Sequence, residues 1–427
     1  MKKLSLLLMM MALVLALTLT GCDDVVDQDP VDEGEAPVVE EPAIEEPVEE
    51  AAKYDDGRYR GTYADRGVEQ IGVQFDIADG VFTAVSFREL AYGGISYRSL
   101  PEDVDPLIAA WDTQYRQAIE YLVGKPLEAF KDLYNTSDFV EDIDGATGAT
   151  IRGNKIASAI QDGLNRGLYS PANGFSTGLP DYDDGRYRGV YYDRGLEQVG
   201  VQFDIADGVF TAVSFRELQY GGTNYRSLPE DAPDVVRAWD AQYRQAIEYL
   251  VGKPVSAIFD LHNTGDFVDD IDGATGATIR GNKIFSAIKD GLNRGLYSPA
   301  NGFSTELPEL EDGRYRGIYT DRNVEQVGVQ FDIADGVFTA VSFRELQYGG
   351  TNYRSLPQDA PDAVKAWDTQ YRQAIEYLVG KPVSAIFDLH NTGDFVDDID
   401  GATGATIRGN KIFSAIMDGI NRGIYSY

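Results

Sequence analysis

A loop of small residues that ends in a hydroxyl group occurs three times in the sequence. Residues Asp144 to Thr150 read Asp-Gly-Ala-Thr-Gly-Ala-Thr, and the same letters recur from Asp272 to Thr278 and from Asp400 to Thr406. Glycine and alanine let a ligand approach the backbone closely. A helix that starts at such a loop offers free N–H groups and the positive end of its dipole. The pattern predicts a phosphate beside a threonine hydroxyl, with a plain helix N-cap as the structural alternative for the last threonine.

The repeated Asp-x-x-Thr-Gly-Ala-Thr resembles the flavinylation motif of the FMN-binding domain family. That family includes flavin-carrying subunits of sodium-pumping and Rnf-type redox complexes and extracellular flavoproteins of Gram-positive bacteria. Its final threonine forms a phosphoester with FMN, made by an exported flavin transferase that uses FAD as donor. The similarity extends to the Asp-Gly-Arg-Tyr-Arg-Gly and Ile-Arg-Gly-Asn-Lys-Ile stretches of each copy. The resemblance therefore implies one covalent FMN on each of Thr150, Thr278 and Thr406.

The resemblance assigns the last threonine and part of the preceding loop to the flavin. Gly-Ala-Thr occurs twice in a row, so Thr147, Thr275 and Thr403 are rival acceptors, but the Asp-x-x-Thr prefix fits the second threonine. Where the family often continues with Thr-Ser, this chain has Ile151-Arg152, so the local contacts differ from the family pattern. The implied cofactor-binding residues are Thr150, Asp144, Thr147, Gly148 and Ala149 in the first copy, Thr278, Asp272, Thr275, Gly276 and Ala277 in the second, and Thr406, Asp400, Thr403, Gly404 and Ala405 in the third.

Three further features of the repeats bear on a flavin site. Tyr92-Gly93-Gly94 and its copies would let the backbone approach a flavin ring, or they form a plain turn. Arg152 and its copies Arg280 and Arg408 face a phosphate or are ordinary exposed helix residues. His262 and His390 replace Tyr134 of the first copy, so no shared catalytic role is expected of them.

The copies belong to a threefold repeat with a constant period. Gly-Arg-Tyr-Arg-Gly starts at Gly57, Gly185 and Gly313, which are 128 residues apart, as are the motif copies. So long a period indicates an array of domains, here residues 57–168, 185–296 and 313–427. The joining segments contain Pro-Ala-Asn-Gly and Leu-Pro and predict short linkers. We therefore expect separately folding units with few contacts between them.

The order of elements within a repeat predicts an α+β fold with an antiparallel sheet and packed helices. Residues 58–63, 68–77 and 81–87 alternate as strands do, and Asp79-Gly80 predicts a hairpin between the last two. Apolar residues at helical spacing from Trp111 to Leu122 predict a helix whose aromatic stripe belongs to the core. A shorter helix is expected over 126–134, and a last one from near Ile151 to Gly167.

The composition excludes several classes of protein. Net charge is −33 with no basic patch, so nucleic acid is not an expected partner. One cysteine and two histidines allow no internal disulfide and argue against zinc, haem and iron–sulfur sites, so we expect no metal centre.

The first residues predict export and lipid anchoring. Lys2 and Lys3 precede an apolar run that ends at Leu19-Thr20-Gly21-Cys22, which resembles the lipobox of bacterial lipoproteins; a transmembrane anchor or a plain signal peptide are the alternatives. The interpretation is a signal peptide over 1–21, lipidation of Cys22, and an acidic, proline-containing tether over 22–56. The chain would then lie on the extracytoplasmic face of the cell membrane.

Together these features predict an electron-transfer protein rather than a stand-alone enzyme. A flavin brings its own redox chemistry, and the protein supplies binding and orientation. No acid–base constellation stands out, so an extracellular flavin-dependent reductase ranks second, and a structural or adhesive repeat lipoprotein without cofactor ranks third. The exported flavin transferase is the implied partner, while the membrane donor and the extracellular acceptor have no signature in the sequence.

Overall fold

A computed structural model describes residues 54–140, 148–172, 175, 177–268, 276–299, 303–396 and 404–426 of the 427-residue chain. For residues 148–152, 276–280 and 404–408, and for Glu69, Glu197 and Glu325, the description covers the backbone only. The described residues all belong to one compact unit. None of the helices in this described part combines the length and the apolar composition needed to cross a membrane.

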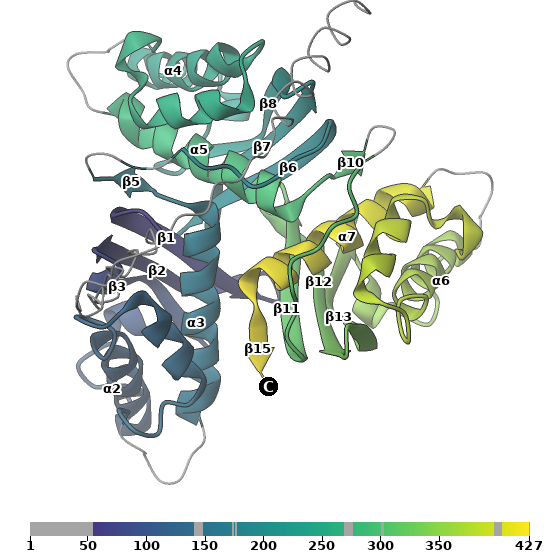
Figure 1. Cartoon of the computed structure of the whole chain (residues 1–427), viewed down its shortest axis with the longest axis horizontal. Coiled ribbons are helices and arrows are strands. Elements are labelled where there is room, and N and C mark those ends of the chain that lie inside the picture. Colours follow the sequence, from purple (N-terminus) through teal and green to yellow (C-terminus); the bar gives the residue numbers. More distant parts are fainter. Residues whose placement is uncertain are drawn as a thin grey trace, which may run out of the picture. The chain divides into compact units, whose positions relative to one another are not determined.

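Each repeat is an α+β domain, so the chain contains three of them in tandem (Figure 1). In the first, three long antiparallel strands and two short edge strands form a sheet in the order β4-β3-β2-β1-β5. The long helix α3 packs along β1 and β2. Its elements are β1 (Gly57–Asp65), β2 (Val68–Ala78), β3 (Val81–Tyr92), β4 (Ile95–Ser96), the 3₁₀ helix η1 (Tyr97–Ser99), α2 (Pro106–Glu120), the 3₁₀ helix η2 (Leu127–Tyr134), α3 (Gly148–Arg166) and β5 (Ser170–Pro171).

The second and third repeats follow the same plan. The second contains β6 (Gly185–Asp193), β7 (Leu196–Ala206), β8 (Val209–Tyr220), β9 (Thr223–Asn224), η3 (Tyr225–Ser227), α4 (Asp234–Leu250), η4 (Val255–His262), η5 (Thr264–Asp266), α5 (Gly276–Arg294) and β10 (Ser298–Pro299). The third contains β11 (Gly313–Asp321), β12 (Val324–Ala334), β13 (Val337–Tyr348), β14 (Thr351–Asn352), η6 (Tyr353–Ser355), α6 (Asp362–Glu376), η7 (Val383–His390), η8 (Thr392–Asp394), α7 (Gly404–Arg422) and β15 (Ile424–Ser426).

The strands follow from alternation and from turn chemistry. Along β2 every second residue is apolar and buried, from Ile71 to Ile77. Asp79 and Gly80 form the two-residue loop between β2 and β3, with φ values of 51° and 70°. Positive φ at both positions is the geometry that matches the twist of a hairpin. The predicted hairpin is therefore confirmed.

The helices cover one hydrophobic core in each repeat. Tyr115, Ile119 and Leu122 are buried, and Trp111 packs against the same cluster, so the aromatic stripe belongs to the core as predicted. On α3 the apolar stripe of Ile156, Ile160 and Leu164 is also buried. The burial of these stripes fixes the face that each helix turns to the sheet.

Two expectations about boundaries and independence are wrong, and one is confirmed. The last helix already includes Gly148, three residues before the expected start, so the Gly-Ala-Thr end of the motif is helical. The short helix expected over 126–134 is confirmed, as the 3₁₀ helix η2 over 127–134. The repeats are not units with few mutual contacts: ion pairs such as Arg88–Asp193 join neighbouring repeats. The start of the first linker also pairs with β1, as strand β5.

Candidate functional site

The proposed acceptor threonines lie in the first turns of the three long helices. Helices α3, α5 and α7 include Gly148, Gly276 and Gly404 as their first described residues, so Thr150, Thr278 and Thr406 have helical backbone. An N-cap residue has non-helical backbone, so the N-cap interpretation of these threonines is wrong. The remaining N–H groups of a first helical turn have no acceptor within the helix. These free N–H groups favour a phosphate group close to the threonine.

Several sequence-predicted residues lie outside the described part of the chain. For Gly148, Ala149 and their copies Gly276, Ala277, Gly404 and Ala405, the backbone is helical. The side chains of Arg152, Arg280 and Arg408 are not described, and neither are the acceptor hydroxyls. Residues wholly outside the described ranges are Asp144, Thr147, Asp272, Thr275, Asp400, Thr403 and the predicted lipidation site Cys22.

A glycine near the start of each long helix allows close packing against a 3₁₀ helix of the same repeat. A Cβ atom on Gly281 would stand 2.1 Å from the carbonyl oxygen of Leu261, at the end of η4. Gly153 and Gly409 have the same relation to Leu133 and Leu389. Only glycine allows the helix to lie so close to the 3₁₀ helix. Each long helix therefore lies directly against the 3₁₀ helix at this glycine.

A buried lysine that sequence reasoning missed lies in the turn after each acceptor. The Nζ atom of Lys283 donates to Oε1 of Gln198 on β7 over 2.5 Å and stands 4.5 Å from the ring centroid of Tyr220. Lys283 is five positions after Thr278, or about 7.5 Å along the helix axis. Lys155 with Gln70 and Tyr92, and Lys411 with Gln326 and Tyr348, repeat the arrangement.

Burial changes the proton affinity of these lysines. It lowers the pKa of Lys283 to about 8, and the pKa of Lys411 likewise to about 8. Desolvation disfavours the ammonium form, and nearby arginines such as Arg60 add to the effect at Lys283. A group whose pKa is this low next to a candidate site is the kind of residue that tunes a ligand's charge.

The Tyr-Gly-Gly segments lie beside these lysines. Gly93 and Gly94 join β3 to β4 with φ values of 61° and 82°, which is the two-residue hairpin geometry that requires glycine. The plain-turn interpretation therefore explains both glycines. The turn also brings the half-exposed ring of Tyr92 over Lys155 of helix α3. The two sequence motifs are thus adjacent in the fold.

The histidines have structural surroundings. Nδ1 of His262 lies 2.9 Å from Oδ1 of Asn282, and the ring packs against Phe285 and against Phe175 of the preceding linker. Burial lowers the pKa of His262, so the ring is neutral. His390 has the same environment in the third repeat, whereas Tyr134 donates to the carbonyl of Ile424. Each histidine ring therefore packs against a phenylalanine of the preceding linker.

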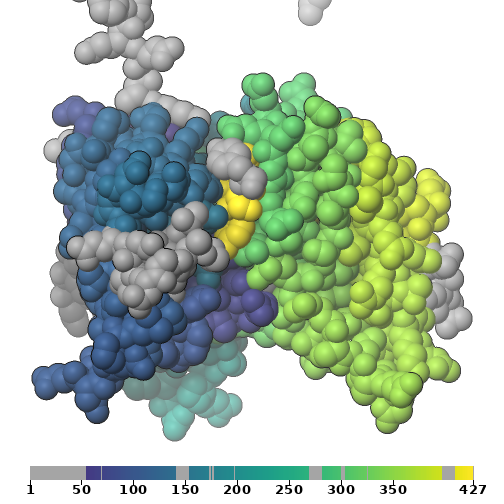
Figure 2. Space-filling model, turned by 90° about the horizontal axis from the view of Figure 1, so that it is seen from below, coloured from purple at the N-terminus to yellow at the C-terminus, as the bar shows by residue number. Residues whose placement is uncertain are grey.

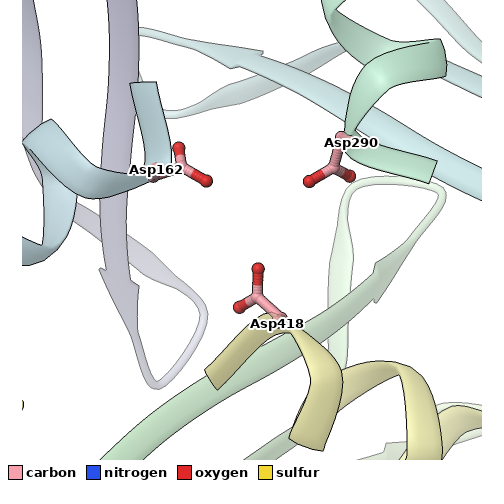
Figure 3. Close-up of side chains that lie close together, drawn as sticks. All are labelled: Asp162, Asp290 and Asp418. Atoms are coloured by element: carbon pink, nitrogen blue, oxygen red, sulfur yellow. The ribbon is translucent and has the colours of Figure 1, made fainter. Parts of the chain in front are cut away.

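A second cluster of charged residues lies where the three long helices meet. The carboxylates of Asp162, Asp290 and Asp418 point toward one another, with oxygens within 4.8 Å (Figure 3). Three carboxylates at this spacing are potential cation ligands. However, Asp162 accepts from Nε of Arg166 at 2.8 Å and faces Nη2 of Arg422 at 3.2 Å.

The arginines neutralise this cluster. Burial alone would raise the pKa of Asp162, but Arg166 and Arg422 hold it below its ordinary value. The other two aspartates have equivalent arginine partners. Three guanidinium groups thus balance three carboxylates, so the cluster is a closed ring of ion pairs that joins the repeats.

Comparison with known proteins gave no match: no family model, no curated protein and no solved structure is similar to this chain.

Proposed function

We propose that the chain is a multi-flavin electron carrier with FMN attached covalently to Thr150, Thr278 and Thr406. The observation that carries the proposal is the threefold Asp-x-x-Thr-Gly-Ala-Thr motif, each copy of which ends in the first turn of a long helix. Phosphate is favoured there by free N–H groups and by the helix dipole. The motif's resemblance to the FMN-binding domain family supplies the identity of the cofactor.

The surroundings of the helix support the same proposal. Lys155, Lys283 and Lys411 follow the acceptors within two helical turns, and each lysine contacts the tyrosine ring of a Tyr-Gly-Gly segment. Each flavin would therefore have a cation nearby, with an aromatic ring beside that cation. A bound flavin supplies reversible one- and two-electron chemistry, and the protein positions it and adjusts its electrostatics.

The proposal includes the location and the partners predicted from the sequence. An exported flavin transferase would load FMN from FAD, and lipidated Cys22 with the acidic tether 22–56 would hold the carrier at the outer face of the membrane. The motivation is the lone cysteine after Leu-Thr-Gly. A Cys22→Ala variant should leave the membrane fraction, and a variant that stays lipidated and membrane-bound would overturn this part.

The direct test of the cofactor is loading. The full chain is co-expressed with a flavin transferase, denatured and washed, so that only covalent flavin remains. Retained yellow flavin supports the carrier, and its absence leaves a structural repeat protein as the better account.

A further inference from the structure

The contacts between neighbouring repeats are the same at all three junctions, and this includes the junction that no linker spans. At the first junction, Nε of Arg88 on β3 donates to Oδ1 of Asp193 over 2.8 Å, and Nη1 of Arg60 lies 3.1 Å from the hydroxyl of Tyr191. Arg166 on α3 donates to the carbonyl of Val190. We call the surface with the arginines the donor face and the surface with Asp193 the acceptor face.

The second junction repeats these contacts between the second and third repeats. Arg216 donates to Asp321 over 2.7 Å, Arg188 to Tyr319 over 2.9 Å, and Arg294 to the carbonyl of Ile318. A stacked tyrosine pair accompanies each junction, Tyr169–Tyr191 at the first and Tyr297–Tyr319 at the second.

The third junction places the donor face of the third repeat on the acceptor face of the first. Arg344 donates to Asp65 over 2.8 Å, Arg316 to Tyr63 over 3.2 Å, and Arg422 to the carbonyl of Thr62. Tyr425 stacks on Tyr63 and is part of the first repeat's core cluster. Figure 2 shows the C-terminal residues in yellow between the blue surface of the first repeat and the green surface of the third.

The pairing is head to tail, because a donor face always meets an acceptor face. Such an interface either grows into an open filament or closes into a ring, depending on its rotation. Here it closes after three repeats, and every one of these three donor faces already has its acceptor. The ring of Asp162, Asp290 and Asp418 with their arginines lies at the point of closure.

We propose that each repeat carries a complete assembly surface for other copies of the same repeat. A ring of three repeats satisfies every donor and acceptor face, so these faces rather than the linkers hold the repeats together. The partner that fits a donor face is therefore another copy of this repeat. The equal contacts at the unlinked junction carry the proposal, since no covalent connection enforces them.

Cutting one linker of the full chain tests the proposal. A protease site replaces residues 300–302, the folded protein is cut, and size-exclusion chromatography after dilution gives the rate at which the third repeat leaves. The cut protein should remain one particle. The proposal would be overturned if the third repeat left the cut wild-type protein as fast as the sample is diluted.

Matched variants distinguish a closed ring from an open row. In a ring, Arg216→Ala and Arg344→Ala weaken the two junctions of the third repeat equally. Each should speed its release by about tenfold or more, because truncating one partner of a largely buried charge pair acts mainly on dissociation. Arg88→Ala, at the uncut junction, should leave the rate unchanged. In an open row Arg344→Ala would behave like the wild type, and that result would overturn the proposal.

Discussion

Arg344 and Asp65 are separated by 279 residues, yet Nε of the arginine donates to Oδ1 of the aspartate over 2.8 Å. The pair joins the last repeat to the first, and its side chains are only 20% and 7% exposed. Contacts of this kind couple the stabilities of the repeats, so a change at the centre of the molecule affects all three.

Asp290→Ala should be strongly destabilising. The substitution leaves the buried guanidinium groups of Arg166 and Arg294 without a shared carboxylate and removes the acceptor of the Val190 N–H. Breaking a buried ion pair from one side costs about 3–5 kcal/mol of the free energy of unfolding. Urea unfolding followed by circular dichroism measures the loss.

Arg314→Ala is the matched control for that experiment. Its partner Asp332 is also an aspartate, but the arginine side chain is 43% exposed. An exposed pair contributes less than about 1 kcal/mol. Equal losses in the two variants would show that the central ring contributes no more than a surface pair.

Gly281→Ala should displace the start of helix α5. The new Cβ would stand 2.1 Å from the backbone oxygen of Leu261, so the helix must shift. Overpacking of this kind costs about 1–3 kcal/mol, and the shift should also lower flavin loading at Thr278. Gly265→Ala is the control, because its Cβ would meet only Oδ1 of Asn263, at 3.8 Å. Unfolding and flavin content are measured on both, and an unchanged Gly281→Ala protein would contradict the close packing.

The stability of the chain should rise with pH above 8. The pKa of Lys283 is about 8 in the folded protein and 10.5 in its ordinary state, so the unfolded chain binds a proton between these values that the folded chain does not. Stability then increases by up to about 1.4 kcal/mol per pH unit for this lysine. Below pH 8 its contribution is constant.

Lys283→Met should reduce that dependence by the contribution of one lysine, because Lys411 still contributes, whereas Lys365→Met at an exposed position should leave it unchanged. The comparison should be made below pH 10. Burial raises the pKa of tyrosines such as Tyr191, so the free energy of unfolding falls with pH above that value. Identical slopes in the wild type and in Lys283→Met would show that Lys283 keeps its ordinary proton affinity.

The three flavins should act in parallel. Asn165, Asn293 and Asn421 bond to one another where the long helices meet, and each acceptor threonine lies fifteen positions earlier, about 22 Å along the helix. Helices α3, α5 and α7 run in different directions from this meeting point (Figure 1). Because electron tunnelling falls steeply with distance, we expect each site to exchange electrons with a partner on its own. Thr278→Ala should remove one flavin's share of the absorbance change on reduction and leave the rate constant of the others as in the wild type. Slowed reduction of the remaining flavins would indicate transfer in series.

The sequence contained enough to predict the fold class, and it placed the candidate motif at the start of the last helix. Alternation along residues 68–77 and the Asp79-Gly80 turn are local signals, and the structure confirms the hairpin. The start of the last helix was misplaced because the small residues Gly148 and Ala149 are typical of a loop, whereas the helix extends through them.

The junctions between repeats could not be predicted in the same way. Arg88 and Asp193 are 105 residues apart, and an arginine on a strand usually faces solvent. Lys283 also looks like any helix lysine until the sheet buries it. The period of 128 residues indicated similar domains, but the closure at three depends on the angle between faces, which no local pattern records.

Intact-mass analysis of the denatured chain, co-expressed with a flavin transferase, tests the central claim most directly. The wild type should carry three FMN groups. Thr150→Ala, Thr278→Ala and Thr406→Ala should each carry two, and Thr147→Ala should keep three. The substitutions should preserve the fold, because alanine is a better helix former than threonine at a helical position. A wild type without flavin would contradict the proposal of an electron carrier. Loss of a flavin in Thr147→Ala but not in Thr150→Ala would show that Thr147, and not Thr150, is the acceptor.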